Sequence, residues 1–160
     1  MHNQRTVMEE AAVMRDSFSV TALTPHTGAE ISCIDLSGPV GQQTAKGLNQ
    51  AFLDHFVIVI RDQKLNASQF LEAMKIFGEV FLQHNPRFAI PECPQIHYIS
   101  NQEKFEDGRI YIPGEGYHTD RSNDIEPPNA TALYAVALPK CGGDTNSSTC
   151  TRLTMPFPKR

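Results

Sequence analysis

Short apolar runs and one amphipathic stretch organise the first third of the chain. The runs at residues 18–23 and 29–34 are rich in apolar or β-branched residues and are separated by a Pro-His-Thr-Gly loop signal, so they predict two strands. Between residues 42 and 55, apolar residues recur at helical spacing and predict an amphipathic helix. These residues are Ala45, Leu48, Ala51 and Phe52.

A second strand and helix pattern follows. Residues 57–60 form a continuous apolar, β-branched run that is too short for a helix and predicts a buried strand. Asn66 precedes the next helical pattern, and Gln69 three residues later completes a capping-box signature. We expect this helix to end at Gly78. Its apolar stripe, which is more typical of core packing than of a cofactor site, consists of Phe70, Leu71, Met74 and Phe77.

Periodicity is weaker on either side of this region. Residues 1–17 have sparse apolar positions and predict a leader that is disordered or partly helical. From residue 80 to 116 the chain is proline-rich, with one expected strand at 96–99. Further strands are expected around residues 118–120 and at 130–138. The pattern alone therefore predicts a protein of mixed α and β structure.

Composition narrows the possible partners. With 160 residues, 40% of them hydrophobic, the chain has the size of one globular domain, although it need not be a complete one. A net charge of -4 without a basic cluster gives no reason to expect nucleic acid or an anionic membrane, and it favours a small-molecule partner. No signal peptide or membrane-length apolar run is evident, so we expect a cytoplasmic location. The widely spaced cysteines are expected to stay reduced, although a zinc site built from them is an alternative.

The most distinctive chemistry lies at residues 118–120, His-Thr-Asp. On an extended segment the first and third side chains point to the same face, so an imidazole and a carboxylate can bind one ion. One nitrogen and one oxygen ligand suit the facial triad of non-haem Fe(II) oxygenases. The alternatives are a structural histidine beside a turn aspartate, and a hydrolytic zinc site completed by Asp35 or Glu115.

Several further motifs accompany this pair in a characteristic order. They are Gly-Ala-Glu-Ile at 28–31, Asp-Leu-Ser at 35–37, the run 57–63, Phe-Gly-Glu at 77–79, Pro-Pro at 127–128 and Gly-Gly-Asp-Thr at 142–145. Together with His118 and Asp120, they resemble the Fe(II)/2-oxoglutarate-dependent dioxygenases of the taurine dioxygenase (TauD/TfdA-like) family. The resemblance covers residues 18–145.

This resemblance carries specific expectations. It implies an α+β fold with an incomplete double-stranded β-helix (jelly-roll, cupin-like) core and flanking helices. It implies Fe(II) bound by His118 and Asp120, 2-oxoglutarate hydrogen-bonded by Thr145, and a substrate contact at His84 or Asn85. The implied reaction hydroxylates or oxidatively cleaves a small organic acid with dioxygen, and it releases succinate and CO2. A homo-oligomer is compatible with the full-length parent.

The resemblance stops after Thr145. In the family a second histidine ligand and an arginine that pairs with the cofactor carboxylate lie well beyond this point, whereas the six histidines here all lie at or before His118. Codons can be chosen for residues 146–160 such that reading two bases further on gives FVNMYTAYDAFPEA, which resembles the family's usual continuation. We therefore expect a frameshift after Thr145, an aberrant tail at 146–160 and an inactive fragment. The alternatives are a genuine short variant and a non-catalytic remnant that binds metal weakly.

Overall fold

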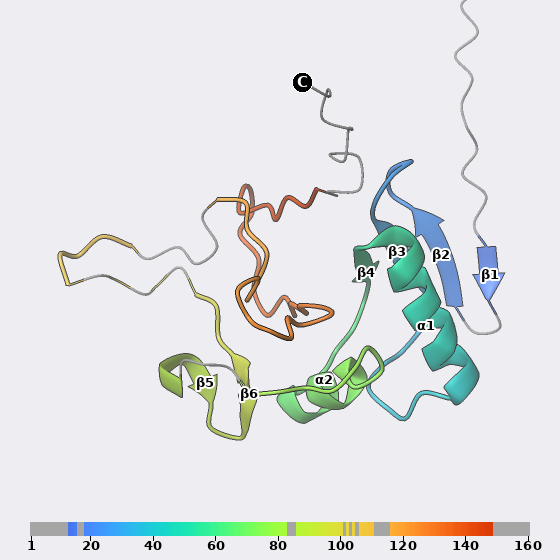
Figure 1. The fold of residues 1–160 in the computed structure, drawn as a ribbon, viewed down its shortest axis with the longest axis horizontal. Coiled ribbons are helices and arrows are strands. Elements are labelled where there is room, and N and C mark those ends of the chain that lie inside the picture. The colour runs from blue at the N-terminus through green and yellow to red at the C-terminus, as the bar shows by residue number, and fades with distance from the viewer. Residues whose placement is uncertain are drawn as a thin grey trace, which may run out of the picture. The chain divides into compact units, whose positions relative to one another are not determined.

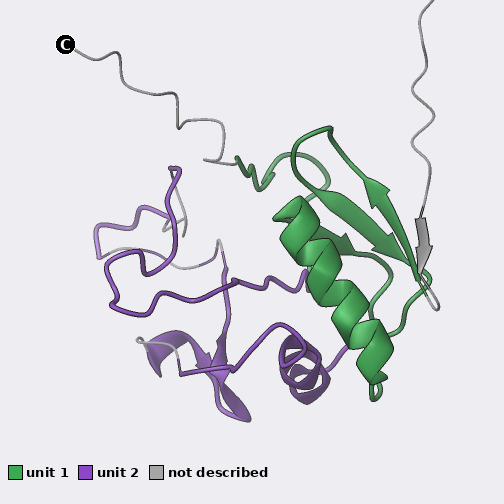
Figure 2. Cartoon of the chain, turned by 45° about the vertical axis from the view of Figure 1, so that its right-hand side comes forward, with its two compact units in different colours: residues 1–64, 137–160 green, residues 65–136 purple. Residues whose placement is uncertain are grey.

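The computed structural model describes residues 13–15, 18–82, 86–100, 102, 104, 106–110 and 116–148. The chain forms two compact units (Figure 2). Unit 1 consists of residues 1–64 and 137–160, and unit 2 consists of residues 65–136.

Unit 1 is built on a four-stranded sheet with the order β1-β2-β3-β4. Its strands are β1 (Val13–Arg15), β2 (Phe18–Ala22), β3 (Ala29–Ser32) and β4 (Ile58–Ile60). The first three pair antiparallel, whereas β4 pairs parallel with β3. A parallel pair needs a crossover connection, and helix α1 (Gln42–His55) supplies it while lying along one face of the sheet (Figure 1). The helix has the predicted boundaries.

The core of unit 1 lies between α1 and the sheet. Leu48 of the helix and Phe18 and Ile31 of the strands are almost completely buried. Each such side chain contributes about 1.5–3 kcal/mol by leaving water. Gly47 allows the close approach, because a Cβ atom at this position would lie 3.1 Å from Cζ of Phe18.

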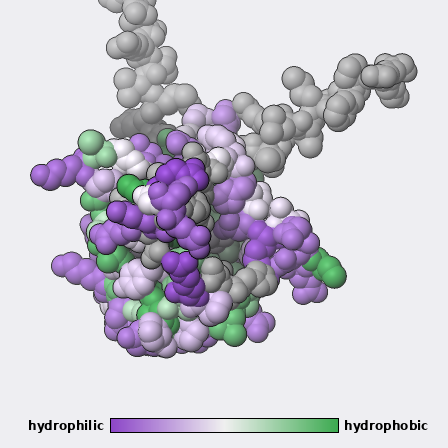
Figure 3. Space-filling model, turned by 90° about the vertical axis from the view of Figure 1, so that its left-hand side faces the viewer, coloured by the Kyte–Doolittle hydropathy of each residue, from purple (hydrophilic) through white to green (hydrophobic). Residues whose placement is uncertain are grey.

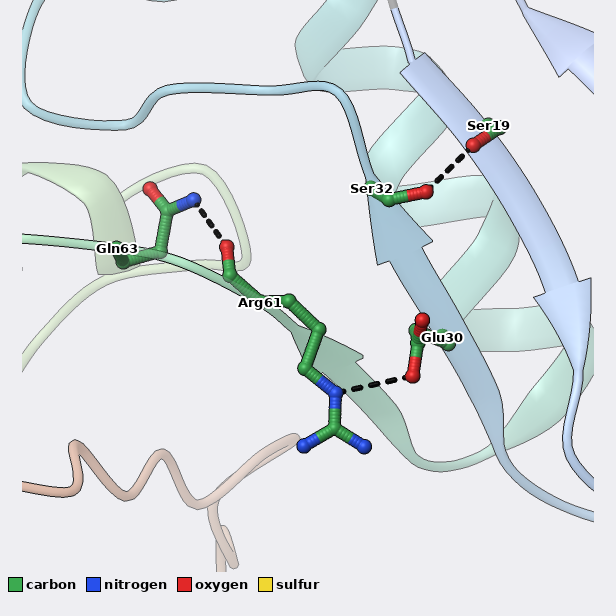
Figure 4. Close-up of polar contacts among 5 residues, drawn as sticks. All are labelled: Ser19, Glu30, Ser32, Arg61 and Gln63. Carbon is green, nitrogen blue, oxygen red and sulfur yellow. Dashed lines mark hydrogen bonds and ion pairs between the residues drawn. The ribbon is translucent and has the colours of Figure 1, made fainter.

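Polar contacts join the strands of unit 1 (Figure 4). Ser19 is buried, and its hydroxyl is hydrogen-bonded to that of Ser32 at 2.7 Å, directly across the β2–β3 pair. On β3, Glu30 forms an ion pair with Arg61 at 2.9 Å. The hydroxyl pair satisfies the buried Ser19 side chain, whereas Glu30 and Arg61 are also accessible to water.

Unit 2 begins with helix α2 (Ala67–Met74) and continues with the 3-10 helix η1 (Pro86–Phe88) and the hairpin of β5 (Ala89–Ile90) and β6 (Cys93–His97). The predicted capping box is confirmed: the Asn66 side chain accepts from the Gln69 amide, and the Gln69 side chain accepts from the Asn66 amide. The helix ends at Met74 rather than continuing to Gly78, and a turn follows.

The two strands expected late in the chain are wrong. Residues 118–120 and 130–138 contain no strand. A strand needs a hydrogen-bonded neighbour, and neither segment pairs with a strand in the described part of the chain. Tyr134 instead anchors the second segment: its ring lies 5.6 Å from that of Phe70, and its hydroxyl accepts from the Leu65 amide at 2.9 Å.

Other expectations were partly correct. Residues 13–15 of the predicted leader form a strand rather than a helix, because they pair with β2, and residues 1–12 and 16–17 lie outside the described part. The strand expected at 96–99 is observed at Cys93–His97. The mixed α and β class is confirmed.

Within the described residues, no helix is long and apolar enough to cross a membrane. On the face drawn in Figure 3, hydrophilic residues predominate and hydrophobic ones are scattered among them.

Candidate metal centre

His118 and Asp120 lie side by side in unit 2 even though they are not on a strand. Nε2 of His118 is 3.1 Å from Oδ1 of Asp120. The His118 side chain is 54% exposed and that of Asp120 is 44% exposed, so an ion from solvent can reach both. The predicted juxtaposition of the two side chains is therefore observed.

The remaining polar atoms of the pair have partners of their own. Nδ1 of His118 is 3.0 Å from the Gly116 carbonyl oxygen, which can only accept, so Nδ1 carries the proton in this contact. Oδ2 of Asp120 accepts a hydrogen bond from the Thr131 hydroxyl at 2.7 Å. Such partners orient histidine and carboxylate ligands in metal sites.

This arrangement leaves two acceptors facing each other. With its proton on Nδ1, a neutral His118 presents the lone pair of Nε2 to the carboxylate oxygen of Asp120. Two lone pairs repel each other at this distance unless a proton or a cation lies between them. A second proton on His118 satisfies the pair when no metal is bound, and a metal ion can replace that proton.

The pKa of His118 reflects this geometry. The hydrogen bond from Nδ1 to the Gly116 carbonyl is the largest cause, and the negative charge of Asp120 comes next; both raise the pKa above the ordinary value of 6.5. Protonated His118 is therefore favoured more strongly than in a free peptide.

The separation of the two atoms also fits a shared ion. Two ligands at about 2.1 Å from a metal, on neighbouring octahedral positions, lie about 3.0 Å apart. The observed separation of 3.1 Å between Nε2 and Oδ1 is close to this value. The same separation is usual for an N–H···O hydrogen bond, so it accommodates either a proton or a metal ion between the two atoms.

Comparison with known proteins identifies the family of the chain. Residues 19–149 match the family described as "Taurine catabolism dioxygenase TauD, TfdA family". The chain belongs to this family. A curated relative, an alkylsulfatase from Acinetobacter baylyi, is 28% identical over 123 residues, which cover 77% of this chain and 37% of the relative.

Two solved structures share the fold over most of the chain. A taurine dioxygenase from Burkholderia xenovorans is 28% identical with a TM-score of 0.56, over 70% of this chain and 38% of that protein. A candidate alpha-ketoglutarate-dependent taurine dioxygenase from the same organism is 29% identical with a TM-score of 0.58, over the same shares. The chain therefore spans less than half the length of these TauD-family relatives.

The other predicted site residues lie in unit 1 or outside the described residues. Thr145 is exposed and belongs to unit 1, whereas His118 and Asp120 belong to unit 2. His84 and Asn85, proposed as substrate contacts, lie outside the described residues, as does Glu115. Among the residues that the structure describes, no group of three or more His, Cys, Asp or Glu could hold a metal ion.

Sequence reasoning missed the groups that support the metal pair. The Gly116 carbonyl is a backbone atom, and no side-chain pattern indicates its role. Thr131 is a polar residue at the start of an apolar run, which is a weak signal that its hydroxyl is used. Thr131 lies 11 residues after Asp120 in the sequence, and only the fold shows that the two side chains are in contact.

Proposed function

We propose that this chain carries part of the active site of an Fe(II)- and 2-oxoglutarate-dependent dioxygenase that hydroxylates or oxidatively cleaves a small organic acid. His118 and Asp120 are its first two metal ligands, and Thr145 is the residue that hydrogen-bonds the cofactor. One observation carries the proposal: Nε2 of His118 and Oδ1 of Asp120 face each other at 3.1 Å. The other polar atoms of the pair, Nδ1 and Oδ2, are hydrogen-bonded to the Gly116 carbonyl and the Thr131 hydroxyl.

The donor set fits Fe(II). One imidazole nitrogen and one carboxylate oxygen match two of the three ligands in the facial triad of non-haem Fe(II) oxygenases. The name of one TauD-family structural relative includes alpha-ketoglutarate dependence, which supports 2-oxoglutarate as the co-substrate. Bound together, Fe(II) and 2-oxoglutarate supply oxidative decarboxylation with dioxygen, releasing succinate and CO2.

The chain's own residues hold and orient these groups. The Gly116 carbonyl orients the His118 ring so that Nε2 faces Oδ1 of Asp120, where the ion would bind, and Thr131 holds Oδ2 of Asp120. The Thr145 hydroxyl would donate to the far carboxylate of 2-oxoglutarate, and His84 or Asn85 would contact the acid substrate.

The proposed domain arrangement follows the same reasoning. Residues 18–145 form the N-terminal part of a double-stranded β-helix domain, preceded by a leader at 1–17. Residues 146–160 are a tail read out of frame. The family match runs to residue 149, four residues beyond Thr145. Translation of the following DNA in all frames is the direct test of a frame change after Thr145.

A second candidate is weak metal binding without catalysis. It is favoured by the lack of a third ligand near His118 and Asp120 within the described residues. Two protein ligands bind a metal ion less tightly than three, because each ligand adds to the chelate. In this case the chain binds Mn(II) or Fe(II) but releases no succinate.

Metal binding and turnover separate the two candidates. Mn(II) titrated into the 15N-labelled chain should selectively broaden the resonances around His118, and His118→Ala should abolish this effect while His97→Ala retains it. Succinate release should then be measured with Fe(II), oxygen and candidate acids, comparing this chain with a protein whose frame is restored after Thr145. Release by the restored protein alone supports the dioxygenase. Equal release by both would show that residues 1–145 already hold a working site and would contradict the interpretation of this chain as an inactive fragment. Selective Mn(II) binding without release by either supports the weak metal-binding protein.

A further inference from the structure

Arg121 directly follows the candidate ligand Asp120, and its side chain makes contacts that the metal chemistry does not require. Its Cζ atom lies 4.5 Å from the centroid of the Phe81 ring, in a cation–π stack. The side chain is only 25% exposed. Nη1 has no acceptor among the described residues, so stacking is the interaction that holds this end of the guanidinium.

The same side chain closes a local turn. Nε donates to Oδ2 of Asp124 at 2.5 Å, and Nη2 pairs with the same oxygen at 2.5 Å. The Asp124 amide donates to the Arg121 carbonyl at 3.0 Å. Arg121 therefore connects the turn at 121–124 to Phe81, which lies 40 residues earlier in the chain.

The backbone of Arg121 indicates that these contacts are needed. Its φ angle is +51°, in the left-handed region that arginine rarely adopts. Such a conformation persists when surrounding contacts fix it. Here the contacts with Phe81 and Asp124 are the ones that fix it.

We propose that Arg121 is a positioning residue for the ligand turn, which we define as residues 116–120. Because its side chain is anchored on Phe81, Arg121 fixes the backbone direction at Asp120. It thereby keeps Oδ1 of Asp120 near Nε2 of His118. The ligand turn itself is exposed throughout, so it receives little order from burial. The consequence for metal affinity rests on the proposed function, whereas the consequence for order of the turn does not.

Metal affinity provides one test. Arg121→Asn removes the anchor but keeps a residue that tolerates a left-handed backbone, so it separates side-chain contacts from backbone strain. We expect the Mn(II) dissociation constant to rise about 10-fold, as is typical when a group that orients a ligand is lost. Phe81→Leu should have the same effect and Phe81→Tyr should not, since only the latter keeps the ring. Arg109→Asn is the matched control, because Arg109 also pairs with a nearby aspartate but is 77% exposed.

An unchanged dissociation constant in Arg121→Asn would overturn the proposal, even if the melting temperature falls, since lower stability alone indicates a merely structural role. Backbone order parameters of the metal-free chain provide a second test that needs no metal. The order parameters of Thr119 and Asp120 should fall below about 0.6 in Arg121→Asn, whereas in the wild type they should be near those of rigid backbone. Equal order parameters in the two proteins would also overturn it. If the wild type binds no Mn(II), the proposed function fails, and this second test still decides the role of Arg121.

Discussion

The Thr131 hydroxyl donates a hydrogen bond of 2.7 Å to Oδ2 of Asp120, and this bond links the ligand turn to the segment that Tyr134 anchors. It leaves Oδ1 of Asp120 directed at His118. A carboxylate with one oxygen held in this way loses less freedom when the other oxygen binds a metal ion.

Replacing Thr131 by Val should therefore weaken metal binding more than it weakens the fold. Val has nearly the same shape but no hydroxyl, so Asp120 can rotate away from His118. We expect the Mn(II) dissociation constant to rise about 10-fold, measured by calorimetric titration. Thr131→Ser keeps the hydroxyl and should stay near the wild-type value. Equal affinities for the Val and Ser variants would show that this bond does not orient the ligand.

The raised pKa of His118 predicts how stability depends on pH. The folded protein holds the His118 proton more tightly than the unfolded chain, whose value is near 6.5. The resulting stabilisation is fully present below pH 6.5 and is lost as the pH rises through the folded pKa. Asp120→Asn removes the negative charge and should lower the pKa of His118 when its ring resonances are titrated by NMR. A pKa that stays unchanged in this variant would show that Asp120 does not act on His118 in solution.

Metal affinity should depend on pH in the opposite direction. The ion competes with the proton that lies between Nε2 of His118 and Asp120, so binding releases a proton at low pH. We expect the Mn(II) affinity to rise with pH until it passes the folded pKa of His118, and then to level off. Titrations in two buffers of different ionisation enthalpy measure the released proton directly. Affinity that is constant between pH 5.5 and pH 8 would exclude His118 as a ligand (about one proton is expected below its pKa).

The helices were predictable because their signals are local. The capping box joins Asn66 and Gln69 within one turn, and the apolar spacing over 42–55 contains the information that defines α1. The segment 130–138 has an equally clear apolar pattern, but a strand also needs a neighbour with which to pair. Leu133 and Val136 are 63% and 72% exposed, because no strand in the described part of the chain covers them.

The candidate site, too, was predictable only where its geometry depends on local sequence. The side chains of His118 and Asp120 meet as predicted, but the strand on which that prediction rested is absent, and an irregular segment that ends in a turn brings them together. The contacts with Gly116 and Thr131, and the stack of Arg121 on Phe81, depend on tertiary structure. No sequence pattern of one chain indicates them.

Gln63 offers a test of how the loop after β3 is held. Its side-chain amide donates to the carbonyl oxygens of Ile34 and Arg61 at 2.8 and 2.7 Å, and its oxygen accepts from the Leu36 amide at 2.9 Å. Gln63→Leu should cost about 1–3 kcal/mol of unfolding free energy, because partly buried backbone groups lose their partners. Gln50→Leu is the control, since Gln50 makes an exposed contact with a helical neighbour. Urea unfolding measures both, and faster hydrogen exchange at Leu36 should accompany the loss.

Gly47 tests the packing of α1 on the sheet. In an exposed helix, replacing Gly by Ala stabilises by up to about 1 kcal/mol. Here the added Cβ would lie 3.1 Å from Cζ of Phe18, a ring that is 1% exposed and has little room to move. Overpacking of this kind costs about 1–3 kcal/mol, so we expect a net loss of unfolding free energy in Gly47→Ala. The control is Gly38→Ala, where nothing lies within 4 Å of the new atom.

The double variant Gly47→Ala with Phe18→Leu should recover part of the loss due to Gly47→Ala, because Leu vacates the space that the Cβ needs. Urea unfolding that shows Gly47→Ala to be more stable than the wild type would mean that α1 packs less closely on β2 than the structure indicates.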